Sequence, residues 1–142
     1  MTLATGIFHR LAMNRAVRTK ADVWRDHIPA SASPLSDGYG NPGKAHVVVE
    51  VVSFSDHYYM DGEADIRDPV IQVTVYAATP EEREHVGRAV KDCLVDYSGR
   101  LDEVNCHHIE RIGGGDRIDM NDDGSDAAAY VRRQDFRVWA TT

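Results

Sequence analysis

The sequence contains very little cysteine, with only Cys93 and Cys106 among its 142 residues. Two cysteines cannot build a disulfide framework, so we expect reduced, partly buried thiols in a chain assembled in a reducing cytoplasm. The sequence also lacks an apolar run long enough to cross a bilayer, since its densest apolar stretch, residues 45–54, is interrupted by His46 and Glu50. These shortages argue against a disulfide-stapled fold and against a membrane as partner.

Positive charge is also scarce, since 16 lysines and arginines stand against 23 aspartates and glutamates and leave a net charge of −7. This argues against non-specific binding along a nucleic-acid duplex, because phosphate binding needs a positive footprint. The charge is uneven: residues 1–20 carry four basic side chains and no acid, so the rest of the chain sums to −11. An acid-free, arginine-bearing start fits a transit segment or an ordinary first helix, and we favour the helix.

Hydrophobic spacing predicts one small α+β domain. Thr79 followed by Pro80 and Glu82 is typical of a capped helix start. Alternating apolar residues at 45–53 and 69–77 predict the two strands of a long antiparallel hairpin. We expect a mostly antiparallel four-stranded sheet with two helices packed on one face and with long loops. Over residues 1–142 the expected elements are helix 3–18, loop 30–44, hairpin 45–77, helix 80–97, and strands 103–112 and 128–140.

The acidic, glycine-rich stretch at residues 113–127 holds two patterns that are typical of ligand sites. Residues 119–124 match the first half of a calcium-binding loop, but the twelfth position is Tyr130, where a bidentate glutamate is needed. We therefore favour a solvated acidic loop and keep a small Ca²⁺-binding interaction module as an alternative. The glycines at 113–115 lack the Lys-Ser/Thr ending of a phosphate-binding loop and open no helix, so we expect a flexible hinge there.

No pattern reaches the level of an enzyme signature, and we predict no catalytic residue, no cofactor and no metal. Cys106, His107 and His108 offer thiol and imidazole groups, but adjacent strand residues point to opposite faces, so at most Cys106 and His108 converge. No second cluster has zinc-ligand spacing, and there is no nucleophile elbow. A small hydrolase or isomerase is a further alternative, which would need a pocket with perturbed titratable groups.

The last predicted strand carries a basic and aromatic group made of Arg132, Arg133, Arg137 and Trp139. Such a stripe suits either a nucleic acid or a protein neighbour. We favour ion pairing with acidic loops of a neighbour, with Trp139 as an anchor, because arginine and tryptophan are enriched at protein interfaces. The other interface candidates are Tyr58, Tyr59, Asp119, Asp122 and Asp123.

Several blocks, read in order over residues 28–140, resemble those of a known family. A proline-containing segment precedes a Gly-rich loop, and the strand VVVEVVSFS is followed by a turn that contains Asp61-Gly62. A second strand, PVIQVTVYAAT, runs into a helix that begins TPEE, and the chain closes with an acidic loop and the strand DFRVWA. In this order the chain resembles the tail-completion, or tail-terminator, proteins of long-tailed bacteriophages and gene transfer agents.

The resemblance implies a structural virion protein without catalytic residues. Proteins of this family form a ring, commonly of six copies, at the tail-neck junction, after assembly in the host cytoplasm. The ring stops polymerisation of the tail tube protein, docks on the head connector or stopper protein, and lets genomic double-stranded DNA pass through its lumen. We expect head-to-tail contacts through sheet edges, with loops 30–44, 55–68 and 113–127 reaching the tube and the connector. An alternative within this class is a head-tail stopper or adaptor in the neck.

Overall fold

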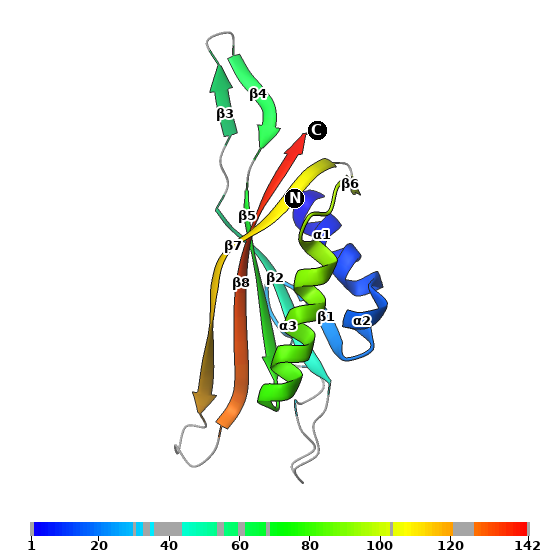
Figure 1. Ribbon diagram of the computed structural model, residues 1–142, viewed down its shortest axis with the longest axis vertical. Coiled ribbons are helices and arrows are strands. Elements are labelled where there is room, and N and C mark those ends of the chain that lie inside the picture. The colour runs from blue at the N-terminus through cyan, green and yellow to red at the C-terminus, as the bar shows by residue number, and fades with distance from the viewer. Residues whose placement is uncertain are drawn as a thin grey trace.

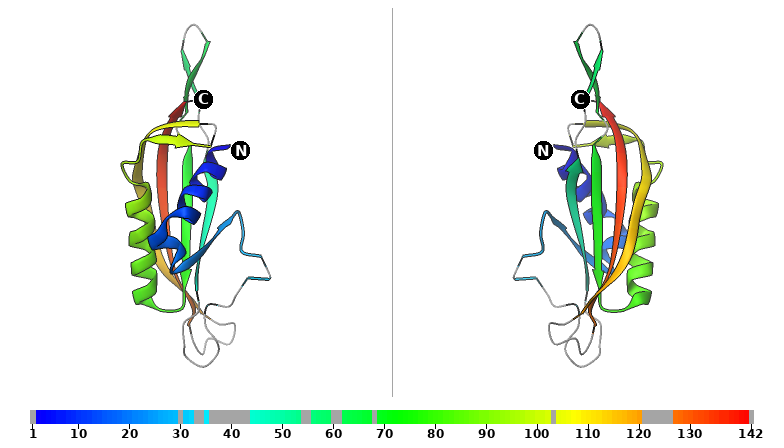
Figure 2. Two further views of the ribbon diagram at one scale, coloured as in Figure 1. Left: turned by 90° about the vertical axis from the view of Figure 1, so that its right-hand side faces the viewer. Right: turned by 90° about the vertical axis from the view of Figure 1, so that its left-hand side faces the viewer.

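A long, twisted sheet forms the body of the molecule, and its helices lie on one face of that sheet (Figure 1). Figure 2 shows the two faces in turn, with the helices in front in one view and the strands in front in the other. The computed structural model describes residues 2–29, 31–32, 35, 44–53, 56–59, 62–67, 69–102, 104–120 and 127–141. The helices are α1 (Thr2–Met13), α2 (Arg15–Arg18) and α3 (Pro80–Leu94). The strands are β1 (Ala21–Arg25), β2 (Ala45–Ser53), β3 (Asp56–Tyr59), β4 (Gly62–Arg67), β5 (Val70–Ala77), β6 (Gly99–Leu101), β7 (Val104–Met120) and β8 (Ala127–Thr141).

The eight strands form one mixed sheet, in which β1 pairs with β2 in parallel and the other pairs are antiparallel. Neighbouring strands follow the order β1-β2-β5-β8-β4-β3. β7 also pairs with β8, and the first residues of β7 pair with β6. β2 and β5 form the antiparallel pair that the alternating pattern predicted, and Val49 lies opposite Val73 in it. The hairpin of β3 and β4 extends beyond the end of the main sheet, and only Ile66 and Arg67 of it pair with β8 (Figure 1).

The predicted four-stranded, mostly antiparallel sheet with two helices is wrong, because the chain is mostly β, with an eight-stranded mixed sheet and three helices. Two whole strands and half of a third arise where loops were expected: β3 and β4 within 55–68, and the end of β7 within 113–127. Both sequences are polar and contain glycine, so they lack the apolar alternation that marks a half-buried strand. The segment that forms β1, Ala21–Arg25, lies between the predicted helix 3–18 and the predicted loop 30–44, where no strand was expected.

The predicted helix 3–18 is divided into α1 and α2 at Asn14. The backbone of Asn14 is extended, with ψ of 122°, and its side-chain oxygen accepts a hydrogen bond from the Val17 amide at 3.1 Å. Asparagine is a favoured N-cap, and this local bond competes with continuation of the preceding helix. Ile7 and Leu11 of α1 are buried, so this helix has an apolar face that packs into the core.

Helix α3 begins where the sequence predicted, with Pro80 at its start. The Thr79 hydroxyl accepts a hydrogen bond from the Glu82 amide at 3.2 Å, which satisfies one of the amides left without a partner at a helix start. The helix ends at Leu94, earlier than predicted, because Val95 already has an extended ψ of 134°. Its buried face packs against β5 and β8.

The hydrophobic core fills the space between the helices and the face of the sheet that they cover. Its largest fully buried side chain is Phe136 of β8, which lies opposite Ile71 of β5. Strand alternation places Gln134 and Val138 on the same face as Phe136. Other large, fully buried side chains are Ile7, Leu11, Val17, Val47, Val49, Val73, Val75, Leu94 and Ile109. In the described part of the chain, every helix is too short or too polar to span a membrane.

Candidate interaction surface

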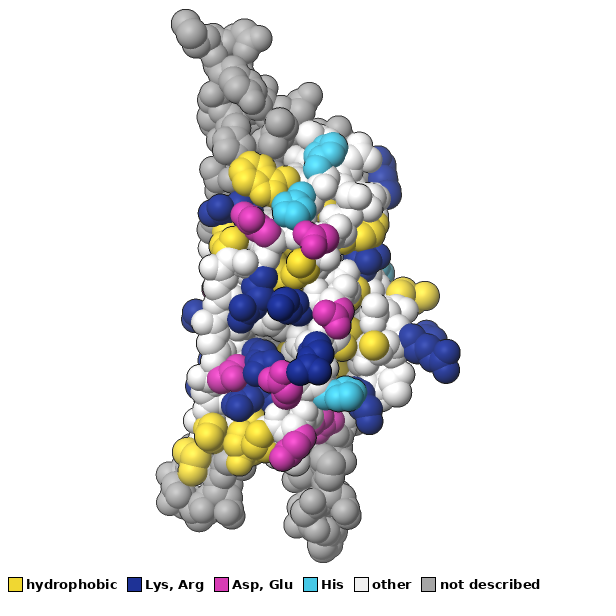
Figure 3. Space-filling model, in the orientation of Figure 1, with side chains coloured by type: hydrophobic (Ala, Val, Ile, Leu, Met, Phe, Trp, Pro, Cys, Tyr) yellow, Lys and Arg dark blue, Asp and Glu magenta, His cyan; other side chains and the backbone are white. Residues whose placement is uncertain are grey.

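The outer edge of β7 is the longest strand edge that has no partner strand among the described residues. β7 pairs with β8 on one side, but on its other side it meets β6 only at residues 104–106. On this strand, Ile112, Ile118 and Met120 are 43%, 52% and 53% exposed. Figure 3 shows hydrophobic side chains gathered where β7 ends and β8 begins. A long edge with exposed apolar side chains is a template for pairing with another chain.

Gly113, Gly114 and Gly115 lie inside β7, so the prediction of a flexible hinge there is wrong. The register between β7 and β8 shifts between Arg111 and Gly113, which marks a bulge. Gly114 has a φ of 148°, and a Cβ atom there would lie 2.2 Å from the carbonyl oxygen of Arg133 on β8. Glycine is the residue that allows two backbones to approach this closely. The run is therefore a packing feature of the edge strand.

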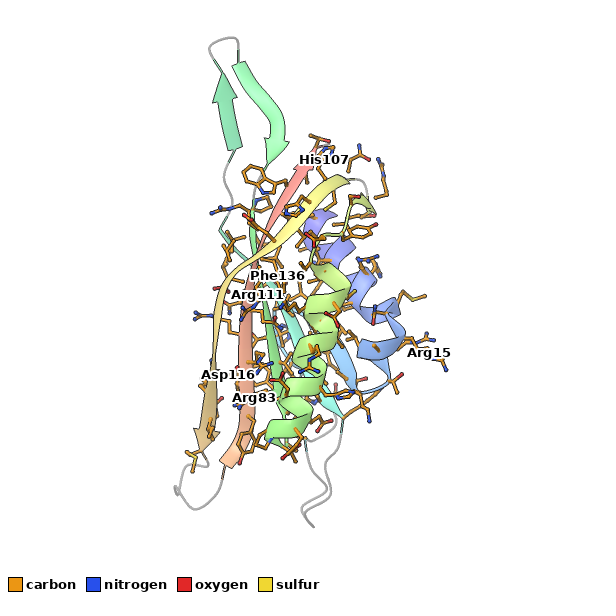
Figure 4. The ribbon with its side chains drawn as sticks, in the orientation of Figure 1. Arg15, Arg83, His107, Arg111, Asp116 and Phe136 are labelled. Carbon is orange, nitrogen blue, oxygen red and sulfur yellow. The ribbon has the colours of Figure 1, made fainter. Side chains whose placement is uncertain are left out.

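A cluster of ion pairs links α3 to β7 and β8 beside this edge (Figure 3). Arg132 of β8 donates from Nη2 to Glu84 of α3 at 2.6 Å and from Nε to Asp116 of β7 at 2.8 Å. Arg83 of α3 lies 3.8 Å from the same Asp116 carboxylate (Figure 4). Hydrogen bonds and positive charge from Arg132 lower the pKa of Asp116 and the pKa of Glu84 below their ordinary values. These bonds also raise the pKa of Arg132, so the cluster is fully charged at neutral pH.

Two further residues hold α3 against β8, and the sequence did not lead us to predict them. Gln134 is buried and donates from Nε2 to the carbonyl oxygen of Gly87 at 2.9 Å. A Cβ atom at Gly87 would lie 2.7 Å from Cδ of Arg132, so the glycine allows the helix to approach that side chain. A polar residue at a core position of an alternating strand was the available signal, because buried polar groups need a partner.

The structure divides the predicted arginine stripe between the two faces of the sheet. Arg132 lies on the helix side, where its side chain is 19% exposed and paired within the chain. Strand alternation places Arg133 and Arg137 on the opposite face. Arg133 lies 3.6 Å from Asp135, and Arg137 lies 3.7 Å from Glu110 of β7. All three arginines therefore already have carboxylate partners in their own chain, and their role in an interface stays a prediction.

Three aromatic candidates lie on two different elements. Trp139 is partly buried on the same face as Arg133 and Arg137, opposite His108 of β7. Tyr58 and Tyr59 belong to β3, where their backbones pair with β4 in the projecting hairpin. In the part of the hairpin that the structure describes, β4 pairs with the end of β8 through Ile66 and Arg67. The interface roles of all three aromatic residues stay predictions.

The acidic candidates lie at and beyond the end of β7. Asp119 is a strand residue opposite Ala129, and its carboxylate accepts a hydrogen bond from Nε of Arg117 at 2.9 Å. Asp122 and Asp123 lie outside the described residues, as does most of the predicted loop 30–44. Within the described ranges, no three histidine, cysteine, aspartate or glutamate side chains come together in a way that could hold a metal ion.

Both cysteines are buried free thiols. Burial raises the pKa of Cys93 and the pKa of Cys106 above the ordinary thiol value, which keeps both groups protonated. His108 is instead 45% exposed and lies 3.8 Å from Asp96. The register of β7 shifts between Cys106 and His108, so these two side chains do not converge as the alternation allowed.

The fold is similar to that of a chain in a solved structure described as "Virion of native gene transfer agent (GTA) particle". The TM-score is 0.68, the sequences are 17% identical, and the match covers 99% of this chain and 96% of the other. No protein-family model and no curated protein matches the sequence. At this identity the likeness shows a shared fold over nearly the whole length of both chains.

Proposed function

We propose that this chain is a structural virion protein that forms a ring at the head-proximal end of a tail tube, ends tail assembly there, and joins the tail to the head connector. The observation that carries the proposal is the fold match to a gene transfer agent virion chain over 99% of this chain. The order of sequence blocks that resembles tail-completion proteins supports the same role. The protein would then act through shape and self-association and would transform no substrate.

The two ends of the sheet suit a head-to-tail ring. Such a ring needs two different surfaces on every copy, and it closes when the rotation between neighbours divides a full turn. Among the described strands, β1 at one end pairs only with β2, and β7 at the other end has a long outer edge. Pairing along β7 would cover Ile112, Ile118 and Met120. We expect each contact between neighbours to bury more than about 1,000 Å².

The partners in this proposal are the tail tube protein on one side of the ring and the connector or stopper protein on the other. Six copies would enclose a lumen through which genomic double-stranded DNA passes without specific binding. The net charge of −7 suits such a passage, because negative walls repel phosphates and leave no site that traps them.

Image classification of the purified protein and of intact particles tests the proposal. We expect a closed ring with an axial channel in both samples, located in particles where the head meets the tail. A position elsewhere in the neck would favour a stopper or adaptor instead. A chain that stays monomeric at high concentration and is absent from particles would overturn the proposal.

A further inference from the structure

A groove of about 650 Å³ lies between α1 and the β6 region, and we call it the α1–β6 groove. Three guanidinium groups and an imidazole share it with one carboxylate, so it is strongly cationic. Its ionisable lining residues, apart from the Tyr97 hydroxyl, are His9, Arg10, Arg15, Arg100 and Asp102. This concentration of positive charge contrasts with a chain whose net charge is −7.

Neutral groups hold two of these guanidiniums in place. Arg10 stacks over the Tyr97 ring, with Cζ 3.6 Å from the ring centroid, and donates from Nε to the carbonyl oxygen of Cys93 at 3.0 Å. Arg100 donates from Nε to the carbonyl oxygen of Asp102 at 3.0 Å. Neither arginine forms an ion pair with a carboxylate among the described residues. The groove therefore keeps donors and charge available for an anion.

Arg15 extends the cationic surface beyond this groove. It is exposed at the start of α2 and points away from the body of the molecule (Figure 4). It also lines the neighbouring groove between α2 and α3, together with Lys20, Arg88 and a single carboxylate, Asp92. Arg15 is thus the residue that the two grooves share.

The hairpin of β3 and β4 differs from the groove in being acidic and in projecting from the sheet. Residues 56–68 contain five acids and one arginine, which is a net charge of −4. Among the described strands, β3 pairs only with β4, and β4 meets the main sheet only through Ile66 and Arg67. The hairpin extends past the end of the sheet (Figure 1). A two-stranded hairpin alone is marginally stable in water, so a surface in another molecule would stabilise it.

We propose that the α1–β6 groove is the docking site for the acidic β3–β4 hairpin of a second copy of this chain. Each copy carries both a cationic groove and an anionic projection, and a head-to-tail contact joins two such different surfaces. The inference rests on the proposed ring and names one contact between its neighbours. It is independent of pairing along β7, which would cover apolar side chains.

A charge swap in the full-length chain tests this docking, with assembly measured by sedimentation velocity at low and at moderate salt. Arg15→Glu with Arg100→Glu reverses the groove, and Glu63→Lys with Asp65→Lys reverses the hairpin. Each pair alone should weaken assembly about tenfold or more, because like charges then face each other. The chain with all four changes should regain assembly, since a reversed hairpin meets a reversed groove. Arg18→Glu, an exposed change on α2 outside the groove, should leave assembly unchanged.

The outcomes separate the docking from the ring. Circular dichroism verifies the fold of each variant, and Arg15→Gln with Arg100→Gln provides a milder, neutral groove. If the groove variants assemble like the unaltered chain, the docking is overturned while the ring stands. The same conclusion follows if the chain with all four changes fails to regain assembly. If groove variants lose binding of a DNA duplex without any change in assembly, the occupant is nucleic acid and the docking is again overturned. If the unaltered chain neither assembles nor occurs in particles, the ring itself fails.

Discussion

The centre of the sheet and its β7 edge are neighbouring regions, but they differ in what covers them. In the centre, Phe136 and Val138 of β8 are fully buried beneath the helices. One strand away, Ile112 and Ile118 of β7 are about half exposed, at 43% and 52%. The difference follows from the packing of α3, whose buried face lies on β5 and β8. Burial of apolar area stabilises the fold, so the centre carries the stability and the edge is available for contacts.

The two regions also differ in the regularity of their pairing. β5 and β8 pair without any shift in register, from Val70 opposite Arg137 to Ala77 opposite Tyr130. β7 pairs with the same β8 through three shifts in register. Bulges bend a strand and change the direction of its side chains. The bulges of β7 therefore change the direction of side chains on the edge strand, while the pairing of β5 with β8 in the core stays regular.

The largest expected effect comes from the centre. Phe136→Ala should lower the free energy of unfolding by about 3–5 kcal/mol, because it leaves a cavity under the helices. Ile118→Ala on the edge should change it by less than about 0.5 kcal/mol. Chemical denaturation followed by circular dichroism measures both. Equal losses in the two variants would contradict the distinction between centre and edge.

The glycines of β7 test whether the edge strand needs its close backbone approach to β8 at Gly114. Gly114→Ala should destabilise the fold by about 1–3 kcal/mol, because the added Cβ meets the carbonyl oxygen of Arg133 and the backbone has a positive φ. Gly115→Ala is the matched control, since no heavy atom lies within 4 Å of a Cβ built there. Thermal melting and hydrogen exchange of the β7 amides measure the effect. Similar melting temperatures for both variants would count against the close backbone approach of β7 and β8 at Gly114.

A charge on the open edge should affect assembly and leave the fold intact. Ile118→Lys should weaken self-association about tenfold, because an edge lysine disfavours pairing with another strand. Val52→Lys, at a position on β2 that is 48% exposed, serves as the control for an exposed apolar residue away from β7. Sedimentation velocity compares the two. Unchanged assembly of the Ile118→Lys protein would remove β7 from the interface.

The smallest expected effect concerns the ion pairs between the two regions. Asp116 and Glu84 have lowered pKa values in the folded chain, so their stabilisation is complete above the ordinary carboxyl pKa of roughly 4 and is lost as pH falls through the lowered values. Arg132→Met removes the guanidinium group that lowers both pKa values. The melting temperature of this variant should therefore fall less than that of the unaltered chain on acidification from about pH 6 to about pH 3. The effect is small because solvent screens exposed carboxylates. Arg133→Met, on the opposite face, should behave like the unaltered chain.

Local patterns predicted some elements well. The start of α3 followed from Thr79 and Pro80, since a capped helix start needs only residues adjacent in sequence. The pairing of β2 with β5 followed from alternating valines and isoleucines, such as Val49 opposite Val73. By contrast, the division of the first helix at Asn14 depends on one side-chain hydrogen bond that competes with the helix.

The candidate surface was harder to predict than the core. The β7 edge runs through Gly113 to Gly115, which are typical of a loop, and its strand character comes from pairing with β8. The cluster of Arg132, Glu84 and Asp116 joins residues distant in sequence, so no spacing rule indicates it. Arg132 was predicted as an interface residue, and its pairs within the chain became visible only in three dimensions.

The sequence by itself determined that residues 45–53 and 69–77 form antiparallel strands and where α3 begins. These features depend on periodicity and capping, which act over a few neighbouring residues. Only the tertiary structure decided that β1 adds in parallel, that β7 forms a long open edge, and that a cationic groove lies beside α1. These features depend on which segments that are distant in sequence pair in the sheet and pack against the helices. The local pattern of side chains does not contain that information.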